Sequence, residues 1–171
     1  MPESSELSVT EYAVLGILAE GPSHGFAVAK ELVANAEVGR ILTVRRPLVY
    51  RALDRLVDQR LAEPVTTEKS DSGPNRTIHR VTGRGRTRLR RWLDKPVDHV
   101  RDMRIEFLLK LAIIRRSGRS PARLVRAQKE SLQSTLEALD DPETDDHVEI
   151  WRRHNARAAG AFLDELEQMY G

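Results

Sequence analysis

A group of basic and polar side chains lies at the start of one predicted helix and in the predicted hairpin that follows it. The helix residues are Arg45, Arg46, Tyr50, Arg51 and Arg55, and the hairpin residues are Lys69, Asn75 and Arg76. The leading end of a recognition helix meets base edges and phosphates, and the helix dipole there favours anions. The pattern therefore predicts that the helix residues contact double-stranded DNA in a major groove. The hairpin residues are expected to meet the flanking backbone or minor groove.

The net charge of +2 conceals an uneven distribution along the 171 residues. Residues 40–91 hold fourteen Lys/Arg against five Asp/Glu, a net charge of +9. Residues 1–39 hold one against six, giving −5, and residues 92–171 hold thirteen against fifteen, giving −2. A basic block between two acidic ones indicates a surface that binds a polyanion. The alternative is a solvated basic face in which each arginine is an ordinary surface charge.

No segment has the residue spacing of a catalytic or metal site. The absence of cysteine excludes disulfides, Cys-ligated zinc, iron–sulfur clusters and thiol nucleophiles. The histidines lack HExxH or comparable zinc spacing, so each is expected to be a surface or structural residue. They are His24, His79, His99, His147 and His154. Gly83-Arg84-Gly85-Arg86 lacks the Gly-Lys-Ser/Thr ending of a P-loop, and no serine has the context of a nucleophile elbow. We predict no enzyme activity, no cofactor and no metal.

Three helices are expected to precede the hairpin and to position the basic residues. The first begins at a capping box formed by Ser8 and Glu11 and ends at Gly21-Pro22. The second is expected from about Ser23 to Ala36. The third opens at Pro47, a residue favoured at the first helical position. The inward-facing residues of the second and third helices are expected to be Val28, Leu32, Val33, Val49, Leu53, Leu56 and Val57.

The apolar pattern then changes from helical spacing to strands. Residues 64–69 and 76–81 are rich in β-branched residues, and the turn-forming run 70–75 separates them. Thr82 caps a further, arginine-rich helix that runs from Gly83 to about Leu93. Three helices followed by a hairpin is the order of a winged helix-turn-helix domain.

Residues 94–98 form the predicted joint between a DNA-binding domain (1–95) and a helical domain (96–171). Helices are expected at 103–116, from Ser120-Pro121 to about Leu139, and from about Thr144 to Met169. The last helix carries an apolar seam at coiled-coil-like spacing, formed by Val148, Trp151, Asn155, Ala158, Phe162, Leu166 and Met169 or Tyr170. A three-helix unit of this size cannot hide so much apolar surface, which predicts a homodimer through these helices. The alternative is that they pack on the first domain.

Trp92 and Trp151 are the candidate residues for a small-molecule effector site, because aromatic side chains commonly line apolar pockets. The alternative is that both tryptophans are packing residues at an interface, where aromatic residues are also enriched.

Several stretches in order resemble the PadR family of transcriptional regulators. They are Leu7–Leu18 (LSVTEYAVLGIL), Gly21–Phe26 (GPSHGF), Val49–Leu56 (VYRALDRL), Gly73–Arg76 (GPNR), Val81–Gly85 (VTGRG) and Phe107–Leu111 (FLLKL). The resemblance implies a homodimeric repressor that binds a pseudo-palindromic operator and is often released by a small molecule. It also implies that Tyr50 and the residues just before it touch DNA and that the C-terminal helices dimerise.

The chain departs from the family pattern at three places. Arg46-Pro47-Leu48 replaces small residues ahead of the apolar-Tyr pair. Arg60 replaces a glycine suited to a left-handed position after the third helix. His79 stands where an aromatic residue is frequent in the wing. These differences bear on the base contacts more than on the fold.

The combined prediction is a mainly α fold, with an N-terminal winged helix-turn-helix domain that has a two-stranded wing and an all-helical C-terminal dimerisation domain. The expected partners are double-stranded DNA, a second copy of the chain and an effector of unknown chemistry, with no membrane. The absence of a signal peptide predicts a cytoplasmic protein. The alternative function is a winged-helix adaptor that binds another protein and has no sequence-specific affinity for DNA.

Overall fold

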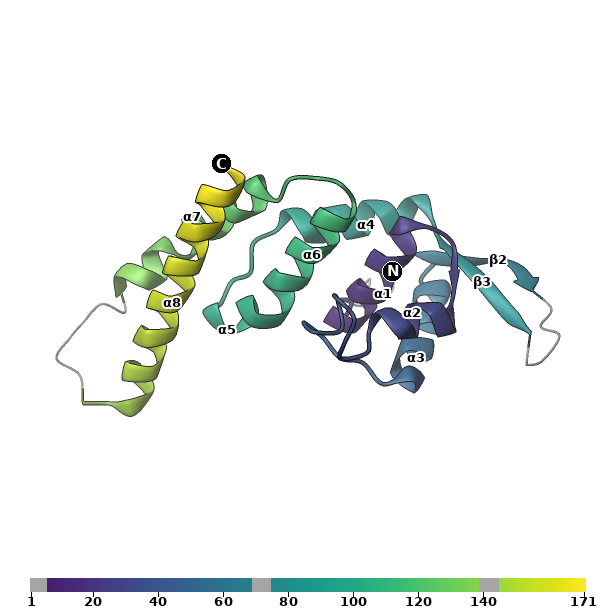
Figure 1. The fold of residues 1–171 in the computed structure, drawn as a ribbon, viewed down its shortest axis with the longest axis horizontal. Coiled ribbons are helices and arrows are strands. Elements are labelled where there is room, and N and C mark those ends of the chain that lie inside the picture. The colour runs from purple at the N-terminus through teal and green to yellow at the C-terminus, as the bar shows by residue number, and fades with distance from the viewer. Residues whose placement is uncertain (1–5, 69–74, 139–144) are drawn as a thin grey trace. The chain divides into compact units, whose positions relative to one another are not determined.

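The computed structural model describes residues 6–68, 75–138 and 145–171, and the chain divides into two compact units, Met1–Trp92 and Leu93–Gly171 (Figure 1). The first unit contains α1 (Val9–Glu20), β1 (Ser23–His24), α2 (Gly25–Glu31), α3 (Arg46–Asp58), β2 (Ala62–Glu68), β3 (Arg76–Val81) and most of α4 (Gly83–Asp94). The second contains α5 (Val100–Asp102), the π-helical turn η1 (Met103–Phe107), α6 (Leu108–Arg116), α7 (Ala122–Ala138) and α8 (His147–Tyr170). The predicted mainly α fold class is confirmed, whereas the roles assigned to residues 1–95 and 96–171 stay predictions.

The first helix begins at the predicted capping box. The Ser8 amide donates to Glu11 Oε2 at 2.6 Å, and the Glu11 amide donates to Ser8 Oγ at 3.3 Å. This reciprocal pair satisfies two amides that a helix start would otherwise leave unpaired. Every residue of α1 from Glu11 to Leu18 is buried, which makes α1 the centre of the first unit's core.

The prediction of one helix from Ser23 to Ala36 is wrong at both ends. Ser23 and His24 form β1 instead, because they pair with His79 and Ile78 of β3. His24 then caps α2, since its Nδ1 accepts a hydrogen bond from the Ala27 amide at 3.1 Å. The helix ends at Glu31, and the chain turns away from the helical path. Val33, predicted to face inward, is consequently 50% exposed.

The sheet has the strand order β1-β3-β2 and is antiparallel throughout. It therefore contains one more strand than the predicted two-stranded wing, whose β2–β3 hairpin projects from the helices of the first unit (Figure 1). The bounds predicted for the second wing strand, 76–81, are confirmed. The first wing strand begins at Ala62, two residues early, because Ala62 pairs with Val81. Lys69 and residues 70–74 of the predicted turn lie outside the described residues.

The third helix ends in a Schellman motif despite the missing glycine. The Leu61 amide donates to the Leu56 carbonyl and the Arg60 amide donates to the Val57 carbonyl, both at 2.8 Å. Arg60 occupies the left-handed position of this motif with φ 58°. The backbone at residue 60 thus has a conformation that glycine adopts without steric cost. With arginine at this position, the Cβ atom makes that conformation strained.

We expect Arg60→Gly to raise the free energy of unfolding by about 0.5–1 kcal/mol. A side chain in the left-handed region costs about 1–2 kcal/mol, and the greater freedom of glycine in the unfolded chain offsets part of that gain. Urea unfolding followed by circular dichroism measures the change. Arg60→Ala serves as the control, because it removes the guanidinium and retains the strained Cβ. Equal gains from both substitutions would show that the arginine head group, and not the backbone, is responsible.

The second unit is wholly helical in its described part. The predicted helix 103–116 is part of a longer helical run that starts at Val100 and includes the π-turn. Helices α7 and α8 lie side by side and are in contact (Figure 1), and their buried apolar residues are Leu124, Val125, Leu132, Ala156, Ala159, Leu163 and Leu166. The side chain of Asp146 caps α8 by accepting from the Val148 amide at 2.8 Å. No helix among the described residues is both long and apolar enough to cross a bilayer.

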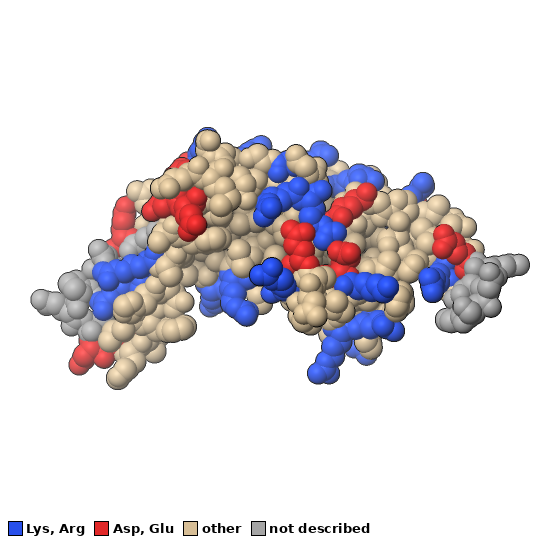
Figure 2. Space-filling model, viewed as in Figure 1, with Lys and Arg blue, Asp and Glu red and all other residues tan. Residues whose placement is uncertain are grey.

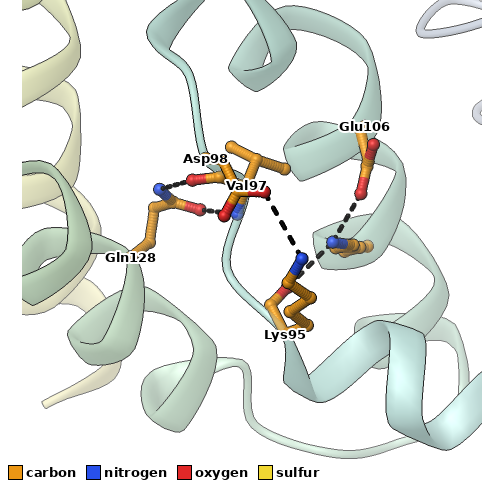
Figure 3. Close-up of polar contacts among 6 residues, drawn as sticks. Lys95, Val97, Asp98, Glu106 and Gln128 are labelled. Atoms are coloured by element: carbon orange, nitrogen blue, oxygen red, sulfur yellow. Dashed lines mark hydrogen bonds and ion pairs between the residues drawn. The ribbon is translucent and has the colours of Figure 1, made fainter.

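Buried side chains hold the segment that leads into the second unit (Figure 3). The amide side chain of Gln128 accepts from the Val97 amide at 2.7 Å and donates to the Val97 carbonyl at 2.9 Å. Lys110 donates to the Lys95 carbonyl at 2.8 Å and pairs with Glu106 at 2.7 Å. Gln128 and Lys110 are both fully buried, and burial lowers the pKa of Lys110 below its ordinary value of 10.5. Lys110 is therefore a structural residue of this segment.

Candidate nucleic-acid interface

The amphipathic helix α3 presents its basic residues to solvent. Its inner side consists of Val49, Ala52, Leu53 and Leu56, all buried. Arg45, Arg46, Tyr50 and Arg51 are consequently exposed, and Lys and Arg side chains protrude where α3 lies (Figure 2). Arg45 occupies the N-cap position without capping the helix through its side chain. The helix begins at Arg46, one residue before the predicted start at Pro47, and Pro47 in the first turn has no N–H group that would need a partner.

Tyr50 is positioned by a close contact with α2. A Cβ atom added at Gly25 would lie 2.5 Å from Tyr50 Cε1 and 3.1 Å from Leu53 Cδ1, so only a residue without a side chain allows this approach. Tyr50 remains 44% exposed. The small Gly25 thus lets the aromatic ring rest on α2, while the side chain of Tyr50 stays partly open to solvent.

The side chain of Phe26 connects α3 to the wing. Arg46 Cζ of α3 lies 4.8 Å from the centroid of this ring, and Arg76 Cζ of β3 lies 5.9 Å from it. Lys30 Nζ, one turn further along α2, lies 5.0 Å from the same centroid. The structure therefore brings Arg46 and Arg76 to the same aromatic ring, and we call Phe26, Lys30, Arg46 and Arg76 the Phe26 cluster. Asn75, also exposed, directly precedes Arg76.

Phe26 and Lys30 were not among the sequence-predicted site residues. Their spacing of four places both on one face of a helix, and this signal is present in the sequence. The contact with Arg46 and Arg76 is not, because it depends on how α2 packs between α3 and the sheet.

Arg55 has a partner that sequence spacing did not reveal. Its Nε lies 3.0 Å from Oε1 of Glu11, a carboxylate that is only 3% exposed. The other oxygen of Glu11 accepts from the Ser8 amide and hydroxyl. Arg55 therefore compensates a buried charge between α1 and α3, although its own side chain is 52% exposed. Its predicted role at DNA stays a prediction, and the ion pair gives it a structural role as well.

Two histidines of the first unit have structural environments. His24 is the N-cap of α2, in line with its predicted structural role. His79 is half-buried, its Nδ1 has no hydrogen-bond partner among the described residues, and desolvation lowers its pKa below 6.5. Within the described ranges, His, Asp and Glu side chains form no group of three that could hold a metal ion.

We expect His79→Phe to stabilise the fold, and more at pH 5.5 than at pH 7.5. Replacing a buried unpaired nitrogen by an apolar ring gains about 1 kcal/mol at pH 7.5. Because the folded pKa is lowered, the unfolded histidine binds more protons below pH 6.5, so wild-type stability falls as pH decreases through 6.5. The variant has no titrating side chain at position 79, so its stability does not fall in this way at low pH. Thermal unfolding at both pH values measures it, and an identical gain at the two would contradict the explanation.

The two tryptophans have different surroundings. Trp92 of α4 stacks on Tyr12 of α1, with ring centroids 4.2 Å apart and an interplanar angle of 6°. Trp151 of α8 is 69% exposed and borders a pocket of about 660 Å³ within the second unit. The pocket is also lined by Val100, Arg104, Thr135 and Asn155. Trp92 is not among its lining residues, so the two tryptophans do not share this pocket.

Comparison with known proteins agrees with the resemblance seen in the sequence. Residues 14–91 match the family model described as Transcriptional regulator PadR-like family. The chain is also similar to the crystal structure of Bacillus subtilis PadR in complex with operator DNA, with 19% sequence identity and a TM-score of 0.51. The match covers 98% of this chain and 100% of that one. No curated protein matches the sequence significantly. The structural similarity supports the winged-helix fold.

Proposed function

We propose that the chain, whose residues 14–91 match the PadR-like family of transcriptional regulators, binds operator DNA as a homodimer and represses transcription. The observation that carries the proposal is the exposed basic surface at the start of α3, with Arg76 of the wing beside it. A recognition helix and a wing on one surface suit a duplex, since one enters the major groove while the other meets the flanking backbone. Two copies would place their α3 helices in successive major grooves, about 34–36 Å apart.

The second unit supports dimerisation through α8. The predicted seam divides in two: Leu166 is buried, whereas Val148, Trp151 and Met169 are 56%, 69% and 62% exposed. Ala158 is also exposed, and Asn155 and Phe162 are half-buried. Phe162 packs edge-on against Phe107 of the same unit at 6.5 Å. The exposed apolar residues are the part of the seam that a second copy would cover, because apolar side chains gain most from removal from water.

The pocket beside Trp151 is the place we propose for an effector. It lies next to the exposed α8 residues that a second copy would cover, so a bound molecule would affect the dimer contact. A change in that contact would alter the separation of the two α3 helices and so the fit to DNA. The finding that Trp92 stacks on Tyr12 favours a packing role for that residue.

The proposal is tested by titrating duplex DNA from the promoter beside the chain's own coding region at several salt concentrations. DNA binding predicts that the logarithm of the affinity falls with the logarithm of salt concentration, by about 0.9 for each phosphate neutralised. A slope near zero would favour the adaptor function, in which the winged-helix unit binds a protein.

Arg51→Ala separates sequence-specific binding from general attraction to phosphate. If Arg51 reads a base, its loss costs about 1–3 kcal/mol on the operator and relaxes the preference at one position. Fluorescence anisotropy with the operator and with a scrambled duplex of equal length measures the loss of affinity on each duplex. Arg91→Ala, which removes an exposed arginine of α4, is the charge-matched control. Equal losses on both duplexes would make Arg51 a phosphate contact only.

A further inference from the structure

The Phe26 cluster concentrates positive charge from three separate elements around one ring. The three cationic groups lie 4.8–5.9 Å from the ring centroid, and all three side chains are exposed while Phe26 is half-buried. Lys30 belongs to α2, Arg46 to the first turn of α3 and Arg76 to the start of β3. The cluster is therefore the place where the recognition helix and the wing are held to a common support.

This arrangement gathers like charges without neutralising them. The negative face of the ring attracts each cation, whereas mutual Coulomb repulsion favours their separation. None of the three cations belongs to an ion pair among the described residues, unlike Arg55 and Arg80, which pair with Glu11 and Glu63. An anion bound beside the ring would relieve the repulsion among the cations that lie around it.

We infer that the Phe26 cluster binds one phosphodiester group of the DNA backbone, at the point where the duplex passes from α3 to the wing. The inference rests on the proposed function and names the group of the DNA that this part of the surface recognises. Guanidinium groups match phosphate oxygens in geometry, and lysine adds a point charge. Such a contact positions the duplex against both elements and reads no sequence. Phe26 is a positioning residue that orients the cations.

The phosphate contact is tested with the full chain and a duplex that the wild-type chain selects from a random pool. Each phosphate is replaced in turn by a neutral methylphosphonate, and the Kd is measured for the wild type, Arg46→Ala and Arg76→Ala. We expect one position in each half-site at which the replacement weakens the wild type about 5- to 10-fold. The same replacement weakens either variant less than about 2-fold, because the interaction is already lost. Arg91→Ala is the control and keeps the wild-type sensitivity at that position.

Substitutions of Phe26 test the ring without altering the charge. Phe26→Leu is expected to weaken DNA binding about 3- to 10-fold and to leave the slope against salt unchanged, because the same phosphates are neutralised. Phe26→Trp retains an aromatic face and is expected to bind like the wild type. Thermal unfolding of both variants shows whether the first unit is intact, and the Trp variant keeps the test decisive if the Leu variant does not fold.

The results distinguish this inference from the proposed function. If Arg46→Ala and Arg76→Ala lose sensitivity at different phosphates, or if a folded Phe26→Leu binds as tightly as Phe26→Trp, the single-phosphate site is wrong while DNA binding stands. Loss of affinity in Phe26→Trp equal to that in Phe26→Leu would also overturn it. If the wild-type chain selects no duplex, both the site and the proposed function are wrong.

Discussion

Replacing Gln128 by leucine is expected to lower the free energy of unfolding by about 2–6 kcal/mol. The substitution preserves side-chain size but removes both hydrogen bonds to Val97, of 2.7 and 2.9 Å. Gln128 is fully buried, so the amide and carbonyl of Val97 would lose their partners away from water. Each buried backbone group left unpaired costs about 1–3 kcal/mol. Urea unfolding followed by circular dichroism measures the loss.

Gln133→Leu is the matched control, because it places the same substitution on the same helix. Gln133 is exposed and donates to Glu137 one turn away at 3.0 Å. Surface substitutions of this kind change stability by about 0.5 kcal/mol or less. If the two variants unfold at the same urea concentration, Gln128 does not stabilise the joint in the way that its contacts indicate.

Replacing Trp151 by glutamate is expected to weaken the proposed dimer at least about 30-fold. A large aromatic residue near the centre of an interface commonly contributes about 2–4 kcal/mol on truncation, and a buried carboxylate adds a desolvation cost. Trp151 is 69% exposed within its own chain, so the substitution should leave the fold of the second unit intact. Sedimentation velocity over a range of concentrations measures the dissociation constant, and circular dichroism reports the fold.

Ala161→Glu supplies the comparison, since Ala161 is an exposed α8 residue outside the predicted seam. We expect this variant to stay dimeric at the concentrations where Trp151→Glu is monomeric. A Trp151→Glu variant that sediments as the wild type does would place the dimer contact elsewhere. A monomeric wild type would refute the dimer itself.

Local sequence signals predicted the elements that carry the site. The Ser8–Glu11 capping box, the start of α3 near Pro47 and the strand 76–81 all appear in the structure. Each depends on residues within a few positions of one another, so spacing alone indicates it. The predicted bounds of the second helix were wrong for the opposite reason, because they depend on distant parts of the chain. Ser23 and His24 have no strand pattern of their own, and they become β1 only because β3 lies beside them.

Among the predicted site residues, tertiary contacts separate roles that the sequence presents as equivalent. Arg51 and Arg55 lie one turn apart on α3, yet of these two only Arg55 forms an ion pair with the buried Glu11. Trp92 and Trp151 are alike in type, yet one stacks on Tyr12 and the other is exposed on α8. Residue type and spacing contain no information about partners that arrive from distant parts of the chain.

By itself, the sequence determined the order of the main helices and of the two wing strands, the basic block at residues 40–91 and the resemblance to a family of regulators. These follow from local spacing, composition and motif order, which need no knowledge of packing. Only the tertiary structure decided that Arg46 and Arg76 meet at Phe26 and that Gln128 holds Val97, 31 residues away. The physical reason is that such contacts depend on how separate helices and strands pack, and that packing is a property of the whole core.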